Sequence, residues 1–263
     1  MDLDRHIPRD SPIHGYDSRL KLLLSLAAIL GIALLPSGSF PAFLVVWVVL
    51  VIASVVARLG PWRLVRGSWI VLPFAIVALP LLFTRPGEPL LAVDLGPLEV
   101  TVTREGLRDA LTIVVKSWLS VQVALLLAYS TPFPSLIEAL RSLRLPSIMV
   151  STIAFMYRYL AVIGEEAGRM NRARSARAAS GGGRGSRLRW RAHTTGAMVG
   201  ALFIRSYERS ERVYAAMLAR GFDGTLRGGE LARPELGALA AFVVGLAAMG
   251  LFTIAVVAWG PRW

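Results

Sequence analysis

Residues 40–57 decide the fold, because they read FPAFLVVWVVLVIASVVA and contain no charged residue and no His. A helix needs about 18–20 predominantly apolar residues to cross roughly 30 Å of hydrocarbon, and this run is long enough to do so. Two further runs, Gly67–Thr84 and Leu236–Pro261, also lack Asp, Glu, Lys, Arg and His. The sequence therefore predicts a protein that crosses a membrane several times.

Two weaker runs complete the set of predicted membrane spans. Leu20–Leu35 is interrupted only by Lys21, whose aliphatic stem lets the ammonium group reach the interface. Leu107–Thr131 carries three charged residues in its first half and none in its second. Pro73 and Pro80 predict a kink in the third span. We therefore expect an all-α, polytopic integral membrane protein with about five transmembrane helices, a sixth being possible.

The composition excludes several classes of protein. Of the 263 residues, 55% are hydrophobic and 17% charged, against about 45–50% and 25% in average soluble domains, so the chain is neither an ordinary soluble domain nor disordered. The absence of Cys excludes a disulfide scaffold, thiolate catalysis and Cys-ligated zinc or iron–sulfur sites. The three His residues, His6, His14 and His193, are scattered, and we expect no metal site and no cofactor.

The basic residues of the loops predict the orientation in the membrane. Pro36–Ser39 has no basic residue whereas Arg58–Arg66 has three, and cytoplasmic loops are the ones enriched in Lys and Arg. The second loop and the N-terminus are therefore predicted to be cytoplasmic, and the connection Arg85–Glu105 and the C-terminus to lie outside. Met1–Asp17 is polar and mixed in charge, so we do not expect it to be a signal peptide.

Most of the formal net charge of +12 lies in one segment. Residues 131–235 hold 17 of the 29 basic residues and 8 of the 17 acidic ones, a net charge of +9. The predicted orientation places this segment in the cytoplasm, between four N-terminal membrane helices in 1–130 and a C-terminal membrane helix in 236–263. Anionic headgroups explain a basic surface beside a membrane, so the lipid bilayer and not nucleic acid is its expected partner.

The first half of the basic segment predicts two helices. Leu136–Leu143 has the apolar spacing of a short amphipathic helix. Leu145–Glu166 ends in a pair of acids, is otherwise apolar except for Arg158, and fits either a sixth span or a buried or interfacial helix. The cost of a central Arg and the basic flanks on both sides favour the second interpretation. This helix is expected to continue to Ala178.

A linker and another helix follow. The Gly-rich run 180–186 lacks the Lys and Ser or Thr that a phosphate-binding loop needs after its last Gly, since Gly185-Ser186 is followed by Arg187-Leu188. An amphipathic helix is expected from about Thr195 to Ala219, with Gly221 just past its end and Arg220 favoured by the helix dipole. Charged residues three and four apart on it predict ion pairs: Arg205, Glu208, Arg209, Glu211 and Arg212.

The two long helices end alike. Arg177 follows Glu165 by twelve residues, and Arg220 follows Glu208 by the same number. Each Arg stands between Ala and a small residue, in Ala176-Arg177-Ala178 and Ala219-Arg220-Gly221. From the residues alone, two ordinary helix ends with dipole-favoured Arg explain this as well as a shared functional motif does.

Three stretches resemble one family. They are Arg172–Ala178, Arg205–Gly224 and the opening Ser11–Leu22, which reads SPIHGYDSRLKL. Together they resemble the transmembrane T component of energy-coupling factor (ECF) transporters, the resemblance covers the whole chain in order, and Arg205–Gly224 is especially similar to the cobalt-type CbiQ branch of this EcfT/CbiQ family. The first motif departs from the family pattern in having Ala178 in place of Gly.

The resemblance implies a subunit without catalysis of its own in a prokaryotic cell membrane. Its coupling helices would dock on two ABC-type ATPase subunits, as a homo- or heterodimer, and grip a membrane-embedded substrate-binding S component, CbiM-like and with or without a small accessory membrane subunit. The implied cargo is cobalt, with a nickel importer or a shared vitamin-type module as alternatives. The implied motif residues are Ala176, Arg177, Ala178, Ala219, Arg220 and Gly221, supported by Glu165, Arg172, Arg174, Arg205, Glu208, Arg209 and Arg212.

Other classes of function fit the sequence less well. A membrane-embedded enzyme needs convergent polar groups, yet three of the predicted spans contain no ionisable residue. A stand-alone secondary transporter would show repeated halves with broken helices, and no later segment matches the kinked third span. The chain has no Walker sequence, so ATP hydrolysis is expected in partner subunits only.

Overall fold

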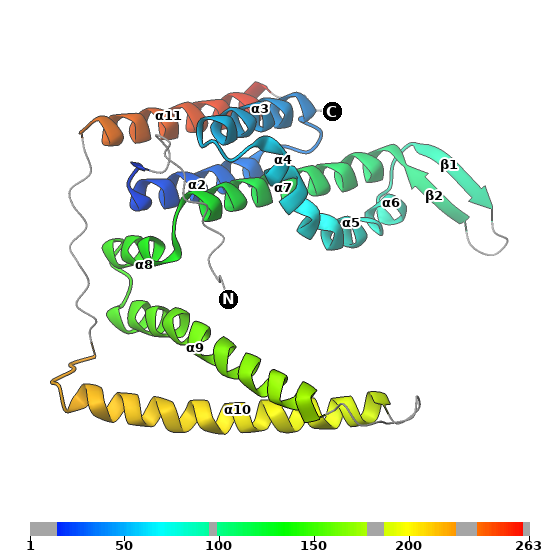
Figure 1. The fold of residues 1–263 in the computed structure, drawn as a ribbon. Coiled ribbons are helices and arrows are strands. Elements are labelled where there is room, and N and C mark those ends of the chain that lie inside the picture. The colour runs from blue at the N-terminus through cyan, green and yellow to red at the C-terminus, as the bar shows by residue number, and fades with distance from the viewer. Residues whose placement is uncertain (1–14, 95–98, 178–186, 225–235, 260–263) are drawn as a thin grey trace. The chain divides into compact units, whose positions relative to one another are not determined.

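The computed structural model describes residues 15–94, 99–177, 187–224 and 236–259. The described chain divides into two compact units, one formed by residues 15–139 and 236–259 and the other by residues 140–224 (Figure 1). Helix α8 (Phe133–Ser142) covers the predicted short amphipathic helix and includes the boundary between the units. Helices make up nearly all of both units, so the predicted all-α class is confirmed.

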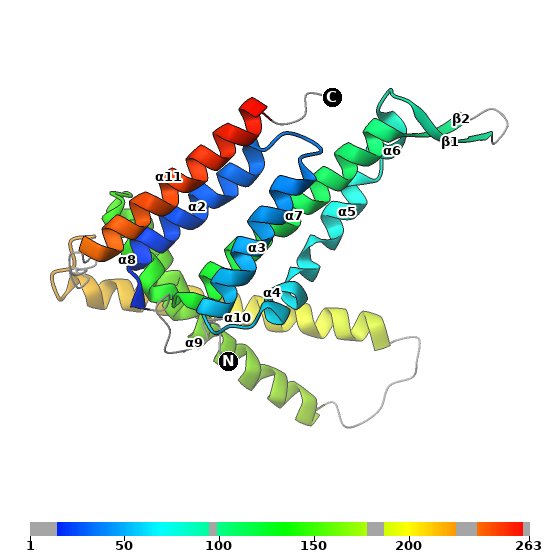
Figure 2. The same cartoon turned by 90° about the horizontal axis from the view of Figure 1, so that it is seen from above.

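Long helices build most of the first unit (Figure 2). They are α2 (Ser18–Leu34), α3 (Phe40–Val56), α7 (Arg104–Ser130) and α11 (Leu236–Trp259). Helix α2 contacts both α11 and α7, and α3 packs on α7. The core between them consists of Ile32, Leu35, Ala42, Phe43, Leu50, Leu119 and Val123. Trp47 on α3 stacks on Trp118 of α7, with ring centroids 6.2 Å apart.

The outer faces of these helices are apolar and uncovered. Leu34, Leu44 and Leu251, for example, each expose more than 60% of their surface. By length and composition, the stretches Pro61–Thr84, Arg104–Ser130, Ser147–Ala176 and Leu236–Ala258 can cross a membrane, and Phe40–Val56 is a shorter apolar helix. A helix with an apolar surface all round is stable in lipid and not in water, so the chain is a multi-pass membrane protein. That the Ser147–Ala176 stretch does not cross the membrane stays a prediction.

The third predicted span is a broken helix, as its prolines indicated. It consists of α4 (Pro61–Gly67), a 3-10 turn η1 (Ser68–Val71), α5 (Leu72–Ala78) and α6 (Leu81–Thr84), which pack along α7. Pro at the start of α5 and just before α6 removes backbone donors that a continuous helix would use. Helix α4 begins earlier than predicted and takes up most of the connection expected to be a loop.

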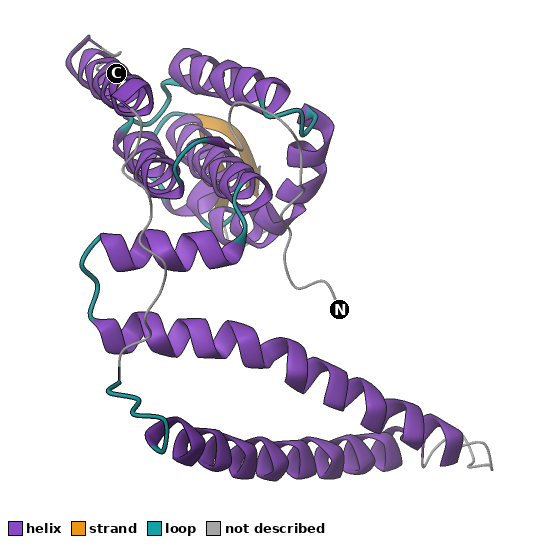
Figure 3. Ribbon diagram, turned by 60° about the vertical axis from the view of Figure 1, so that its left-hand side comes forward, coloured by secondary structure: helices purple, strands orange, loops and turns teal. Residues whose placement is uncertain are grey.

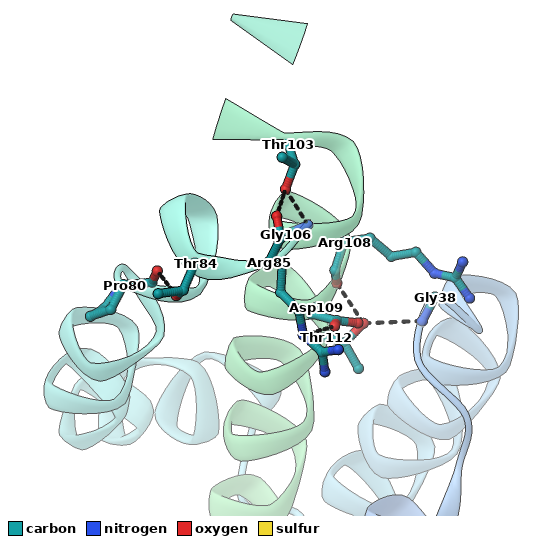
Figure 4. A network of polar contacts seen from close by, with 9 residues as sticks. All are labelled: Gly38, Pro80, Thr84, Arg85, Thr103, Gly106, Arg108, Asp109 and Thr112. Carbon is teal, nitrogen blue, oxygen red and sulfur yellow. Dashed lines mark hydrogen bonds and ion pairs between the residues drawn. The ribbon is translucent and has the colours of Figure 1, made fainter. Parts of the chain in front are cut away.

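A β-hairpin, which the sequence analysis did not predict, follows α6. Strands β1 (Pro89–Asp94) and β2 (Glu99–Thr103) pair antiparallel. Polar contacts fix its base (Figure 4): the Thr103 hydroxyl donates to the Arg85 carbonyl at 2.8 Å and accepts from the Gly106 amide at 3.2 Å. Arg85 also forms an ion pair with Asp109 at 3.1 Å. Thr103 thus caps α7 and holds the hairpin on it.

Two lysines of the predicted spans bond to helix ends. Lys116 on α7 donates to the carbonyls of Ala33 and Leu35 at 2.9 and 2.6 Å, at the C-terminus of α2. Lys21 donates to the carbonyl of Ser130, the last residue of α7, at 3.3 Å. A cation at a helix C-terminus satisfies carbonyls that the helix leaves unpaired and complements its dipole. This accounts for charge inside otherwise apolar helices.

Candidate functional site

The second unit contains the two helices that carry the paired motifs. Helix α9 (Ser147–Arg177) and helix α10 (Arg187–Leu218) are long and continuous (Figure 3). Helix α9 has nearly its predicted limits, and α10 ends near its predicted end. Helix α10 begins eight residues before the predicted Thr195, so it includes Arg187, which was expected to precede the helix. Three contacts show that the helices run antiparallel: Phe155 with Phe222, Glu166 with Arg205, and Arg174 with Thr195.

The C-terminus of α10 ends in a tightly bonded turn. Gly221 has φ +79°, in the left-handed region that glycine adopts without strain. Its amide donates to the Leu218 carbonyl at 3.0 Å, and the Phe222 amide donates to the Met217 carbonyl at 3.0 Å. This pair of bonds defines a Schellman motif and confirms the prediction that Gly221 is the residue just past the helix. Arg220 therefore stands on a turn of fixed backbone.

Phe222 anchors that turn to the other helix. Its ring meets the ring of Phe155 on α9 edge to face, with centroids 6.2 Å apart. Offset and edge-to-face aromatic pairs add about 0.5–1.5 kcal/mol to the burial of their area. The side chains of Ala219 and Arg220, in contrast, are exposed. The second motif is thus fixed to α9 through Phe222, while Ala219 and Arg220 remain accessible to a partner.

The first motif closes α9. The helix ends at Arg177, with Ala176 exposed, and Ala178 lies outside the described residues. One turn earlier, Arg174 donates to the Thr195 hydroxyl on α10 at 2.9 Å, whereas Arg172 is exposed. The end of α9 therefore lies beside the first half of α10.

The two motifs lie at opposite ends of the helix pair. Phe222 places the Arg220 turn beside Phe155, which is 22 residues before Arg177 on α9. At 1.5 Å per residue, about 33 Å of helix separates these two levels. A single groove of one partner cannot receive both arginines at that separation, so the geometry fits two docking sites.

The predicted ion pairs are correct in one case and wrong in another. Arg212 pairs with Glu208 at 3.9 Å within α10, as the four-residue spacing predicted. Arg205 was expected to pair along its own helix, but it donates to Glu166 of α9 at 2.8 Å. Arg209 and Glu211 follow on the same helix, where Arg209 is half-buried and lines the cavity between α9 and α10.

Glu166 is the residue that the sequence analysis missed. It neighbours the selected Glu165, which is exposed, and the sequence offers no signal that separates the two. Arg169 and Arg205 both donate hydrogen bonds to the Glu166 carboxylate, and these bonds lower the pKa of that carboxyl. Glu166 lies beyond the apolar run of α9, which ends at Gly164. The carboxylate is therefore ionised and bonded to both helices.

The second motif offers groups suited to contact with a partner. No group of three or more His, Asp or Glu side chains in the described ranges is placed to hold a metal ion. At the second motif, the exposed Arg220 donates in a forked geometry suited to carboxylates, and the small residues Ala219 and Gly221 beside it let a partner's backbone approach. Among known proteins, the family model of the cobalt transport protein CbiQ matches residues 9–229. The chain belongs to the CbiQ family.

Some relatives are named CbiQ and others EcfT, the two names of the family that the sequence resembles. The cobalt transport protein CbiQ of Rhodobacter capsulatus is 29% identical over 58% of this chain and 61% of its own length. A putative fused cobalt transport protein CbiMQ of Methanocorpusculum labreanum is 29% identical over 85% of this chain and 37% of its own. The energy-coupling factor transporter transmembrane protein EcfT of Heliobacterium modesticaldum is 28% identical over 97% of this chain and 96% of its own.

These matches confirm the resemblance to T components of ECF transporters. The chain spans less than two thirds of the length of the first two of these relatives and nearly all of the third. A CbiQ family member is a membrane transport component, which agrees with the apolar helices of the first unit.

Proposed function

We propose that this chain is the T subunit of an ECF-type ABC importer, and that it transmits ATP-driven movement from two ATPase subunits to a membrane-embedded S component. One observation carries the proposal: two Ala-Arg ends, at Arg177 and Arg220, lie about 33 Å apart along a helix pair. Each end would enter a groove of one ATPase subunit. The chain itself would be non-catalytic, with hydrolysis in its partners.

The residues around Arg220 suit such docking. At the second end, Gly221 adds no side chain, and no atom lies within 4 Å of where its Cβ would be. The guanidinium of Arg220 can then pair with a partner carboxylate as the two surfaces close. The supporting residues divide by position: Arg172 and Arg174 precede the first end, and Arg209 and Arg212 precede the second.

Cobalt is the proposed cargo. The matching family model is that of a cobalt transport protein, and a relative is named as a fusion of CbiM and CbiQ, which supports a CbiM-like S component. A second candidate is a shared module that serves other S components, because the EcfT relative matches 97% of the chain and its name carries no metal. Co-purification of the S component, followed by uptake of labelled cobalt and nickel, separates these candidates.

We place the second unit in the cytoplasm and the C-terminus outside, on the strength of the loop charges. Reporter fusions at Met1, Gly183 and Trp263 are expected to report inside, inside and outside. An inside C-terminus would contradict the five-span arrangement and make α9 a sixth span.

Alanine substitutions of the two arginines test the docking role. Truncating one side of a charged, partly buried contact costs about 2–5 kcal/mol, much of it from the partner charge left unpaired. We expect Arg220→Ala to release ATPase subunits strongly, Arg177→Ala comparably or somewhat less, and the double variant completely, with membrane insertion intact. The matched control is Arg187→Ala, at the first residue of α10, where a cation gains nothing from the helix dipole.

The alternative is that both arginines only stabilise their helix ends. Each substitution would then cost about 0.3–1 kcal/mol and the complex would survive. The measurement is the amount of ATPase subunit retained on the purified double variant. Full retention with normal uptake would refute the docking role.

A further inference from the structure

Near the middle of the helix pair, between the Phe155–Phe222 and Arg174–Thr195 contacts, a carboxylate joins the two motif-bearing helices. Glu166 on α9 accepts a hydrogen bond from Arg205 on α10 at 2.8 Å and another from Arg169, one turn further along α9. The Arg205 bond spans 39 residues of sequence and so fixes tertiary geometry, whereas the Arg169 bond is local. The Glu166 side chain is 17% exposed, while the Arg205 side chain is 61% exposed.

The space between the helices is hollow on both sides of this ion pair. Toward the Phe222 end, a cavity of about 420 Å³ is lined mostly by apolar side chains, among them Phe155 and Met217. Toward the other end, a second cavity of about 670 Å³ is lined in part by Trp190. Glu166 and Arg205 line both cavities. The ion pair therefore bridges the helices between two openings.

Apolar packing does little to set the crossing at this level. Met156, which lines the first cavity, leaves 59% of its surface exposed, and Tyr159 and Val162 are half-buried. Burial of apolar area is also non-directional, whereas a guanidinium bonded to a carboxylate fixes both distance and angle. At this level the direction of α10 relative to α9 therefore depends on the polar contact, in addition to the Phe155–Phe222 and Arg174–Thr195 contacts nearer the two ends.

We propose that Glu166 is a positioning residue, whose carboxylate clasps α10 through Arg205 and so sets the relative direction of the two arginine ends. The proposal rests on the docking function proposed above. Arg177 lies about 17 Å beyond Glu166 along α9, and Leu218 lies about 20 Å beyond Arg205 along α10. With arms of this length, each end moves about 3 Å for every 10° of rotation at the clasp.

The strength of the clasp suits a joint that opens and closes. Partly exposed ion pairs shift an equilibrium by a factor of at most about five, because water and salt screen them. The clasp therefore biases the crossing toward one geometry without locking it. Arg169 lies on the same helix as Glu166 and stays bonded to it when the Arg205 bond breaks. It therefore keeps the Glu166 carboxylate oriented so that the Arg205 bond can form again.

A distance measurement tests the clasp in the full chain. The protein has no Cys, so spin labels can be attached at Asn171→Cys and Ala216→Cys, two exposed positions on α9 and α10. The otherwise unaltered chain in detergent should give one narrow distance distribution, and Glu166→Gln should broaden it. Arg205→Gln should broaden it similarly, and the double variant no further, because both remove the same bond.

Glu165→Gln is the matched control. It makes the same change of charge one residue away, on an exposed side chain, and should leave the distribution narrow. A narrow distribution in both single variants would overturn the clasp, and so would equal broadening by Glu165→Gln, since that would indicate a general charge effect. Coupled uptake should fall up to about fivefold with Glu166→Gln while ATPase subunits stay bound.

The two proposals fail in different measurements. Failure of the docking proposal would be seen as ATPase subunits retained on the Arg177→Ala/Arg220→Ala variant, and it would leave the spin-label distances unaffected. Failure of the clasp proposal would be seen in the spin-label distances of the chain alone, without any partner present.

Discussion

Replacing Gly221 by Ala would test how the second motif is held. Gly221 has φ +79°, where a Cβ costs roughly 1–2 kcal/mol. No atom lies within 4 Å of a Cβ built there, so the cost comes from the backbone and not from a clash. The hydrogen bonds of Gly221 to Leu218 and of Phe222 to Met217 both require this conformation. We expect Ala to destabilise the turn by at least about 1 kcal/mol, Asn by less and Val by more.

The same helix offers a control with the opposite sign. Gly200 lies in the interior of α10, has no atom within 4 Å of a built Cβ and has no positive φ. Glycine in a helix interior is less favourable than Ala by about 0.5–1 kcal/mol. Gly200→Ala should therefore stabilise α10, although it is the same substitution as Gly221→Ala.

Hydrogen exchange of the full chain measures both effects. A loss of about 1 kcal/mol should speed exchange of the Gly221-region amides about fivefold. Gly221→Ala should also lower the retention of ATPase subunits, because the Arg220 guanidinium loses its fixed direction, whereas Gly200→Ala should not. If Gly221→Ala protected the turn as Gly200→Ala protects the helix, the reasoning from φ would be refuted.

Further predictions concern the first unit, the isolated chain and acidity. Lys116→Met should destabilise the unit by about 1–3 kcal/mol in a detergent-resistance assay, because the carbonyls of Ala33 and Leu35 lose their donor; unchanged detergent resistance would contradict this. The purified chain should hydrolyse no ATP until ATPase subunits are added, and activity of the chain alone would end the proposed role. The Glu166–Arg205 bond should persist at neutral pH and weaken only as the pH falls through the lowered pKa of Glu166; spin-label distances recorded across an acid titration check this sign.

The sequence determined the helical class and the membrane because these depend on local properties. A run such as residues 40–57 fixes its own environment, since its length matches the bilayer and every turn is apolar. Gly221 could be predicted as the residue past the α10 end for a similar reason, because the conformational freedom of glycine is a property of one position. The family, too, could be inferred from residues contiguous in the chain.

Contacts between distant residues could only be seen in the folded chain. Arg205 has acidic residues three and six positions later, and local spacing favours the first, yet it bonds Glu166 on the other helix. In the sequence Lys116 is only a charged residue in an apolar run, whereas in the fold it donates to two carbonyls at the end of α2. The opposite placement of Arg177 and Arg220 likewise follows from how α9 and α10 pair. Local patterns set which helices form, but directional bonds between side chains set where their ends point, and those bonds require tertiary structure.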